Sequence, residues 1–384
     1  MRNAEGVNRL ALHNCNSKYV NNGDFHRKNF NCRGIERIGQ GFSHPRQPAP
    51  CVYKRVRRVY YAPMRLSKLM QWKMASSCVT AFFMFLIPRP ILSAQTPSAS
   101  PVTTANASSG SSLQEQIRSI AVDAHGKVSV ACSLPKSKLN CDLDPQAHPP
   151  MQSVFKLPLA LAVLHQVELG KLSLDQQVRF TPEDRILPHA YSPLQDKYPE
   201  ANVDVPLREL LRLSVTLSDN VAADILLRLA GGPQPVNAYI ASLGVTGFHL
   251  QDGEDVLHRD VSAQYRNWFE PSGAVQLLRK ISDNSPFTVE HTNLLLNWMH
   301  APARTKRLEA DLPDGTVVAH KSGTSDVDNG VAHATNDIAL ITLPDGRRLA
   351  IAVFVTDSTA DDATREKVIA RIGRAAYDAS LRKH

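Results

Sequence analysis

Hydrophobic residues recur along the chain at spacings that distinguish helices from strands. A helical period predicts helices over residues 114–122, 153–169, 207–213, 220–229, 272–281 and 363–381. Short apolar runs bounded by turn residues predict strands over 127–134, 138–143, 316–320, 337–342 and 349–356. Strands therefore occur at both ends and helices in the middle. This order predicts an α+β fold whose first and last segments share one sheet, with a helical domain inserted between them.

The first 94 residues differ from the rest of the chain in charge. They carry 16 Lys and Arg against 3 Asp and Glu, whereas the remainder carries 28 against 33. The net charge of +8 therefore comes from a basic leader, and it gives no reason to expect nucleic-acid binding by the mildly acidic body. An apolar run over residues 75–87 follows basic residues and precedes small ones, which is typical of a secretory signal peptide. The run is shorter than the roughly 20 residues that a membrane span needs.

These features predict how the chain is organised. We expect residues 1–63 to be an upstream extension without a structural role and residues 64–94 to be a signal peptide. Residues 95–112 are rich in Ser, Thr, Pro and Ala and are expected to be a flexible mature N-terminus. Residues 113–384 form the folded body, with a sheet part at about 113–150 and 285–384 and a helical part at about 151–284. We expect a monomeric periplasmic protein without a stable membrane anchor.

Two cysteines remain once the leader is removed, Cys132 and Cys141. They lie in two predicted strands on either side of a turn at residues 135–138. An antiparallel hairpin with that turn would place the two cysteines opposite one another. A disulfide is therefore feasible in an oxidising compartment, and a pair of reduced cysteines is the alternative. No metal-ligand spacing involves either residue.

A Ser-x-x-Lys element, Ser153 to Lys156, stands at the start of a predicted helix. The spacing places the hydroxyl and the amine on one helix face, within mutual reach. A serine hydroxyl is a poor nucleophile, and a lysine activates it only when burial or neighbouring charge lowers the lysine pKa. The motif alone is weak evidence, because a second copy, Ser133 to Lys136, spans a turn that contains Pro135.

A second polar element, Ser218-Asp219-Asn220, directly precedes a predicted helix. Such residues are common helix N-caps, which is the structural explanation. The functional alternative is that Ser218 relays a proton to a leaving nitrogen while Asn220 hydrogen-bonds an amide of the substrate.

A third element, Lys321-Ser322-Gly323, follows the strand predicted over residues 316–320. An exposed strand end with a turn glycine is the structural explanation. In the functional alternative Lys321 supplies positive charge, Ser322 binds a carboxylate, and Gly323 lets a ligand approach the strand edge.

The three elements, separated by 65 and 103 residues, are together far more specific than any one of them. In this order they make the chain resemble the serine β-lactamase and penicillin-binding-protein superfamily. The resemblance covers about 270 residues and implies an antiparallel sheet with flanking helices and an inserted all-helical domain. The string GEDVLH at residues 253–258 and QYRNW at 264–268 resemble the divergent class A branch that includes the PER-type extended-spectrum enzymes.

The same resemblance implies roles for residues outside the three motifs. Glu254 matches the carboxylate that activates water in class A enzymes, although Asp252 and Asp255 are rival carboxylates and a solvated acidic loop is the structural alternative. His258 stands four residues beyond Glu254 and is expected to help position that water through a hydrogen bond.

Further matches are expected to contribute to substrate binding. The string PDGTVVAHK at residues 313–321 resembles the family's approach to its binding strand, and Arg307 matches an arginine that helps to bind the substrate carboxylate. A position on a helix surface is the structural alternative for Arg307. Tyr191 matches an aromatic residue at the cleft mouth, with loop packing as the alternative. The backbone N–H of Thr324 is expected to form an oxyanion hole with that of Ser153.

The chain also departs from the family pattern. Its binding triad is Lys-Ser-Gly where Lys-Thr-Gly is commoner, which leads us to expect retained function with altered specificity. The Arg-x-x-Glu-x-x-Leu-Asn loop pattern of mainstream class A enzymes is absent, which leaves the loop geometry open.

The resemblance implies hydrolysis of penicillins and cephalosporins through an acyl-enzyme on Ser153, with antibiotic resistance as the result. Either Lys156 or Glu254 acting through water takes the serine proton, and Ser218 with Lys321 passes a proton to the departing nitrogen. Neither a cofactor nor a metal is expected, and the expected partner is the β-lactam alone. A D,D-peptidase or penicillin-binding protein is the first alternative, and a β-lactam-sensing receptor domain is the second.

Overall fold

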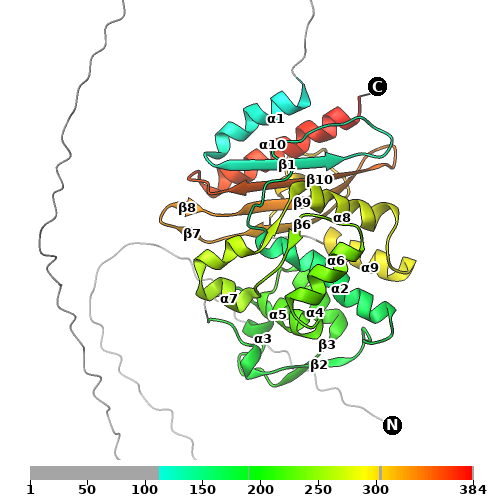
Figure 1. Ribbon diagram of the computed structural model, residues 1–384, viewed down its shortest axis with the longest axis vertical. Coiled ribbons are helices and arrows are strands. Elements are labelled where there is room, and N and C mark those ends of the chain that lie inside the picture. The colour runs from blue at the N-terminus through cyan, green and yellow to red at the C-terminus, as the bar shows by residue number, and fades with distance from the viewer. Residues whose placement is uncertain (1–111, 189, 302–304, 383–384) are drawn as a thin grey trace, which may run out of the picture. The chain divides into compact units, whose positions relative to one another are not determined.

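The computed structural model describes residues 112–188, 190–301 and 305–382. Its main sheet has four antiparallel strands (Figure 1). Its strands stand in the order β1 (Lys127–Ser133), β10 (Arg348–Thr356), β9 (Thr335–Thr342) and β6 (Val318–Thr324). The first long strand of the described chain thus pairs with the last one. The prediction that the two ends of the body share one sheet is confirmed.

Two helices, α1 (Leu113–Ala121) and α10 (Asp362–Ser380), lie side by side over one face of this sheet, as Figure 1 shows. Alternate residues of β10 point to opposite cores. Ile351, Val353 and Val355 belong to the core beneath α1 and α10, whereas Ala352 and Phe354 belong to the core on the other face. Because both faces are covered, β10 forms a nearly continuous apolar run.

The larger core on the opposite face is built around α2 (Lys156–Glu168), whose residues 156–164 are all buried. The other described helices are α3 (Pro193–Lys197), α4 (Leu207–Thr216), α5 (Asn220–Leu229), α6 (Pro233–Ser242), α7 (Glu254–Arg259), α8 (Pro271–Asp283) and α9 (Val289–His300). Of these, α8 packs on β1 and β10 and α9 packs on β6. A helix buried on all sides is a rigid support for the groups at its start.

Short strands and 3₁₀ turns complete the described chain. The strands pair as β2 (Gln177–Phe180) with β3 (Val203–Pro206), β4 (Phe248–His249) with β5 (Trp268–Phe269), and β7 (Val327–Asp328) with β8 (Val331–Ala332). The turns are η1 (Val122–Ala124), η2 (Gln152–Phe155), η3 (Pro182–Asp184), η4 (Val261–Arg266) and η5 (Arg307–Glu309). No helix in the described ranges is long and apolar enough to cross a membrane. The predicted signal peptide and the upstream extension lie outside the described residues.

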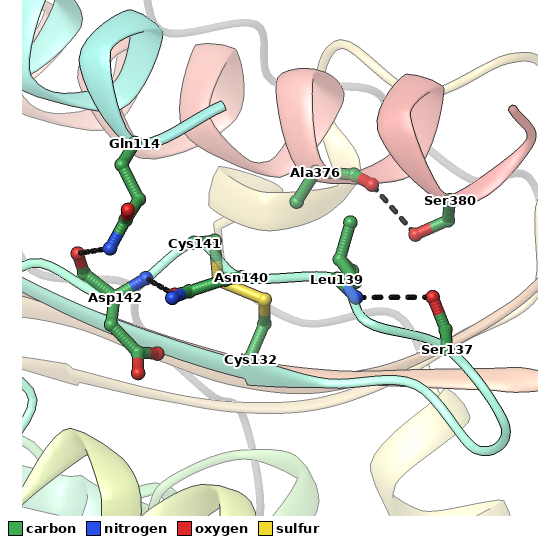
Figure 2. Close-up of a disulfide and its surroundings, with 9 residues drawn as sticks. All are labelled: Gln114, Cys132, Ser137, Leu139, Asn140, Cys141, Asp142, Ala376 and Ser380. Atoms are coloured by element: carbon green, nitrogen blue, oxygen red, sulfur yellow. Dashed lines mark hydrogen bonds between the residues drawn. A yellow bond between two sulfur atoms is a disulfide. The ribbon is translucent and has the colours of Figure 1, made fainter. Parts of the chain in front are cut away.

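The strand predicted over residues 138–143 is wrong. The segment touches β1 through a single bridge between Val130 and Leu143. Nearby side chains accept hydrogen bonds from backbone N–H groups of this segment, as Figure 2 shows: Ser137 Oγ accepts from Leu139 at 3.1 Å, and Asn140 Oδ1 accepts from Asp142 at 2.9 Å. Such local bonds compete with strand pairing.

A disulfide nevertheless joins Cys132 on β1 to Cys141 in this segment (Figure 2). The two Cα atoms are 5.8 Å apart, which is within the usual range for a disulfide. The feasible pairing expected from the sequence is therefore present, although a single bridge and not a regular hairpin brings the segments together.

Replacing both cysteines by alanine is expected to lower the midpoint of thermal unfolding by about 5–10 °C. A cross-link between residues nine apart stabilises by roughly 2–3 kcal/mol on the chain-entropy estimate, and a protein of this size changes by about 2–4 °C per kcal/mol. Calorimetry of the wild type with and without a reductant is the matched comparison. Equal midpoints for the oxidised wild type and the double variant would contradict the expectation.

Candidate active site

Ser153 lies in the turn η2, directly before α2 and not inside the predicted helix. The strand β6 approaches this turn closely, because a Cβ atom on Gly323 would lie 2.5 Å from the carbonyl oxygen of Met151. Asn336 on β9 donates to the carbonyl oxygens of Pro150 at 2.9 Å and Met151 at 3.3 Å. The sheet therefore fixes the turn that carries the Ser153 hydroxyl.

Lys156 is fully buried and contacts four polar groups. Its Nζ donates to Ser153 Oγ at 2.9 Å, to the carbonyl oxygen of Ser218 at 2.7 Å and to Asn220 Oδ1 at 2.5 Å. These bonds use the three protons of an ammonium group. Glu254 Oε1 lies 2.8 Å from the same nitrogen and forms an ion pair with it. The meeting of Ser153 and Lys156 that the spacing predicted is present.

The polar residues 218–220 at the start of α5 have two roles: one residue caps the helix, and the other two contact Lys156. Asp219 is the N-cap, because its Oδ1 accepts the N–H of Ala222 at 2.9 Å. Ser218 has a left-handed backbone, with φ of 60°, and its carbonyl oxygen accepts a hydrogen bond from Lys156. The capping explanation thus holds for Asp219, whereas Ser218 and Asn220 belong to the polar cluster around Lys156.

Lys321 lies within β6, whereas the sequence predicted that the strand ends before it. Residues 322–324 remain paired with residues 335–337 of β9, which extends the strand. Nζ of Lys321 donates to Ser218 Oγ and to the carbonyl oxygen of Ser322, both at 2.9 Å. Burial, followed by the charge of Lys156, lowers the pKa of Lys321 to about 7. Ser218 is therefore held between two lysines.

Glu254 begins helix α7 and is only 4% exposed. The backbone N–H groups of Glu254 and Asp255 donate to the two carboxylate oxygens of Asp224 on α5, at 2.7 and 2.8 Å. Burial, followed by the negative charge of Glu254, raises the pKa of Asp224 to about 7. Asp224 thus fixes the start of α7, and the sequence analysis did not identify it.

The two rival carboxylates of this loop, Asp252 and Asp255, both pair with arginines. Asp252 accepts from Arg266 Nε at 2.7 Å, and Asp255 accepts from Arg259 Nε at 2.9 Å. Of the three acidic residues, Glu254 is the one whose carboxylate meets Lys156. The solvated-loop alternative is therefore wrong for Glu254.

Arg307 is buried, so its placement on a helix surface is wrong. Its Nη1 donates to the carbonyl oxygens of Gly323 and Asn336, both at 2.8 Å, and its Nη2 donates to Thr324 Oγ1 at 2.8 Å. Nε donates to Glu366 on α10 at 3.2 Å. The guanidinium thus ties the end of β6 to β9 and α10.

A buried pair beside Lys321 was also missed. Nδ1 of His320 lies 3.0 Å from Asp337 Oδ2, and the same oxygen accepts the N–H of Leu308 at 3.1 Å. Burial by itself lowers the pKa of His320, but the charge and hydrogen bond of Asp337 outweigh it and the net pKa is raised. The sequence did carry a signal for this pair, because His320 and Asp337 are titratable residues within two predicted strands, 316–320 and 337–342.

A cavity of about 410 Å³ opens over these groups. The predicted site residues that line it are Ser153, Tyr191, Ser218, Asn220, His258, Arg307, Lys321, Ser322 and Thr324. Lys156, Glu254 and Gly323 are buried around it without lining it. In the described part of the chain, no group of three or more His, Cys, Asp or Glu side chains is placed to hold a metal ion. A serine hydroxyl and a buried carboxylate that both contact one lysine nitrogen, beside an open cavity, suit acyl transfer through a covalent intermediate.

Comparison with known proteins agrees with this geometry. Residues 112–380 match the model of the beta-lactamase enzyme family. The extended-spectrum beta-lactamase PER-1 of Pseudomonas aeruginosa is 41% identical over 272 residues, which cover 71% of this chain and 88% of that protein. The beta-lactamase VEB-1 of the same organism is 33% identical over 274 residues, covering 71% and 91%.

Two solved structures extend the comparison. The crystal structure of a beta-lactamase from Chitinophaga pinensis superposes with a TM-score of 0.67 at 42% identity and covers 70% of this chain and 99% of that one. The crystal structure of the TLA-1 extended-spectrum beta-lactamase gives 0.68 at 40% identity, covering 70% and 98%.

Proposed function

The chain belongs to the beta-lactamase enzyme family as a class A serine β-lactamase, and on that premise we propose that it hydrolyses penicillins and cephalosporins through an acyl-enzyme on Ser153. The observation that carries the proposal is the cluster around Lys156 Nζ. A nucleophile and a buried carboxylate both lie within 2.9 Å of this nitrogen. Such a cluster supplies one base for each half of a double displacement.

In the first half, Ser153 Oγ attacks the lactam carbonyl carbon and the C–N bond of the ring breaks. Its proton passes to Lys156 or, through a water molecule, to Glu254; both routes remain open for enzymes of this type. Lys156 Nζ lies 2.9 Å from Ser153 Oγ, which places the two atoms within reach for the first route, in which Lys156 acts as a neutral amine. The N–H groups of Ser153 and Thr324 are proposed to stabilise the carbonyl oxygen as it becomes an anion.

The departing ring nitrogen then receives a proton from Ser218. The hydrogen bond from Lys321 Nζ to Ser218 Oγ supports this role, because the ammonium lowers the cost of removing the hydroxyl proton. Lys321, Ser322 and Arg307 are proposed to bind the substrate carboxylate. For Arg307 the binding is partly indirect, since three of its donors already hold Gly323, Asn336 and Thr324.

In the second half, Glu254 activates a water molecule that attacks the acyl carbon and restores the Ser153 hydroxyl. The ion pair holds the Glu254 carboxylate beside the nitrogen of Lys156 that also contacts Ser153, which supports the role of Glu254 as the base. Fast deacylation is what separates this proposal from a D,D-peptidase or a β-lactam-sensing domain, both of which remain acylated.

Steady-state turnover tests the proposed function. The purified protein is expected to hydrolyse a chromogenic cephalosporin and benzylpenicillin at about 1–10³ per second, and to leave a D-alanyl-D-alanine peptide intact. One equivalent of product per enzyme followed by stalling would favour the penicillin-binding alternative, and release of D-alanine would identify a peptidase.

The activity is expected to fall on the alkaline side of about pH 7. The pKa of Lys321 is lowered to about 7, so the free enzyme loses this positive charge as the pH rises through that value. An anionic substrate favours the charged form, so kcat/KM is expected to fall by about tenfold per pH unit above 7 while kcat falls only at higher pH.

The variant Lys321→Arg provides the control for this pH profile, because its guanidinium keeps its charge throughout. We expect the variant to be less active at its optimum but to lose the alkaline limb near pH 7. The same limb in both proteins would show that another group is responsible.

Export to the periplasm through residues 64–94, and a monomeric state, complete the proposal. Amino-terminal sequencing of protein isolated from the periplasm would test cleavage near Ala94, and light scattering would test the monomer.

A further inference from the structure

Asn220 is held by two neighbours whose chemistry fixes the orientation of its amide group. Lys156 Nζ lies 2.5 Å from Asn220 Oδ1 and donates to it, because an ammonium group has no lone pair. The amide oxygen therefore faces Lys156. The amide nitrogen Nδ2 must then point to the other side, where it lies 2.7 Å from Nε2 of His258.

The second contact determines which ring nitrogen of His258 accepts a hydrogen bond. An amide NH₂ group only donates, so Nε2 of His258 has to accept and the ring proton has to be on Nδ1. Nε2 of His258 has one lone pair, which Asn220 uses, and Glu254 Oε2 lies 3.7 Å away, beyond hydrogen-bond distance.

Asn220 Nδ2 carries two protons, and His258 takes one of them. Both residues line the cavity that Ser153 also lines. Asn220 is 7% exposed, and His258 is held in the first helical turn after Glu254. The remaining N–H of Asn220 is thereby left as a donor for a ligand.

We propose that His258 is a positioning residue for substrate recognition: by accepting one N–H of Asn220, it aims the other at the amide carbonyl of the acylamino side chain of a β-lactam. The inference rests on the proposed function and adds to it the residue that orients the amide group of Asn220. It differs from the water-positioning role that the family resemblance implies, because it assigns Nε2 to Asn220.

The test compares benzylpenicillin, which carries an acylamino side chain, with 6-aminopenicillanic acid, which lacks one. The acylation rate constant divided by the binding constant is measured for both, so that deacylation by Glu254 does not enter. In His258→Leu the ratio between the two substrates is expected to fall by about three- to tenfold, the usual effect of one lost hydrogen bond. In His258→Gln, whose side-chain oxygen still accepts an N–H, most of the ratio is expected to return.

Nitrogen-15 spectra of labelled histidine give a readout that a purely structural role would not change. They are expected to show the Nδ1–H tautomer of His258, because Nε2 accepts from Asn220. This measurement and the variant His258→Gln keep the inference testable if His258→Leu does not fold.

An unchanged ratio in His258→Leu, or an equal loss on both substrates, would overturn the inference. So would an Nε2–H tautomer at high pH. A wild-type protein that hydrolyses both substrates with such results retains the proposed function and loses only this inference, whereas a protein that opens neither substrate loses both.

Discussion

Ser153→Ala is expected to lower kcat/KM for penicillins and cephalosporins by about 10⁵–10⁶-fold. The change removes the hydroxyl that Lys156 Nζ contacts at 2.9 Å. The Ser218 hydroxyl does not replace it, because Lys321 holds that group at 2.9 Å and Lys156 contacts the Ser218 carbonyl instead. Steady-state hydrolysis gives the loss in rate, and mass spectrometry of the protein mixed with substrate is expected to show no acyl adduct.

The chain provides a matched control for this variant in its second Ser-x-x-Lys sequence. Ser133 ends β1, and Lys136 follows Pro135 in the turn beyond it, so the pair lacks the helical alignment of Ser153 and Lys156. Ser133→Ala is expected to retain the wild-type rate. A Ser153→Ala protein that still forms a covalent adduct would mean that another residue is the nucleophile.

Glu254→Gln is expected to separate the two halves of the reaction. Acylation continues, because Lys156 still contacts Ser153, but deacylation is expected to slow by about 10²–10⁴-fold since the base is lost. A chromogenic cephalosporin should then give a burst of about one product per enzyme followed by slow turnover. Mass spectrometry is expected to find the acyl group retained on Ser153.

Asp255→Asn is the control for this second variant, because it neutralises the adjacent carboxylate. The side chain of Asp255 pairs with Arg259 at the surface and does not reach Lys156. Its turnover is expected to match the wild type. Unchanged steady-state hydrolysis in Glu254→Gln would contradict the assignment of Glu254 as the deacylation base.

Local patterns were sufficient for much of the secondary structure. The helix predicted over residues 220–229 is observed with the same bounds, because the N-cap Asp219 and the apolar spacing both lie in that stretch. The strand predicted over 138–143 failed for an equally local reason. The side chains of Ser137 and Asn140 accept hydrogen bonds from nearby backbone N–H groups. Such bonds compete with strand pairing, and apolar patterning does not reveal them.

The sequence by itself determined the fold class, the family and the spacing of the three motifs, because these depend on residue type and order. The tertiary structure decided which polar groups meet. Ser218 and Glu254 lie far from Lys156 in the sequence. Only the packing of α2, α5 and α7 brings the Ser218 carbonyl oxygen and the Glu254 carboxylate to the side-chain nitrogen of Lys156.

The same reason explains what the sequence analysis missed. Asp224 is an ordinary residue within a helix until α7 places two N–H groups on its carboxylate, and the hydrogen-bonding role of His258 follows from its contact with Asn220. Donor and acceptor directions arise from three-dimensional contacts within a few ångströms, whereas sequence periodicity reports only which face of an element is buried.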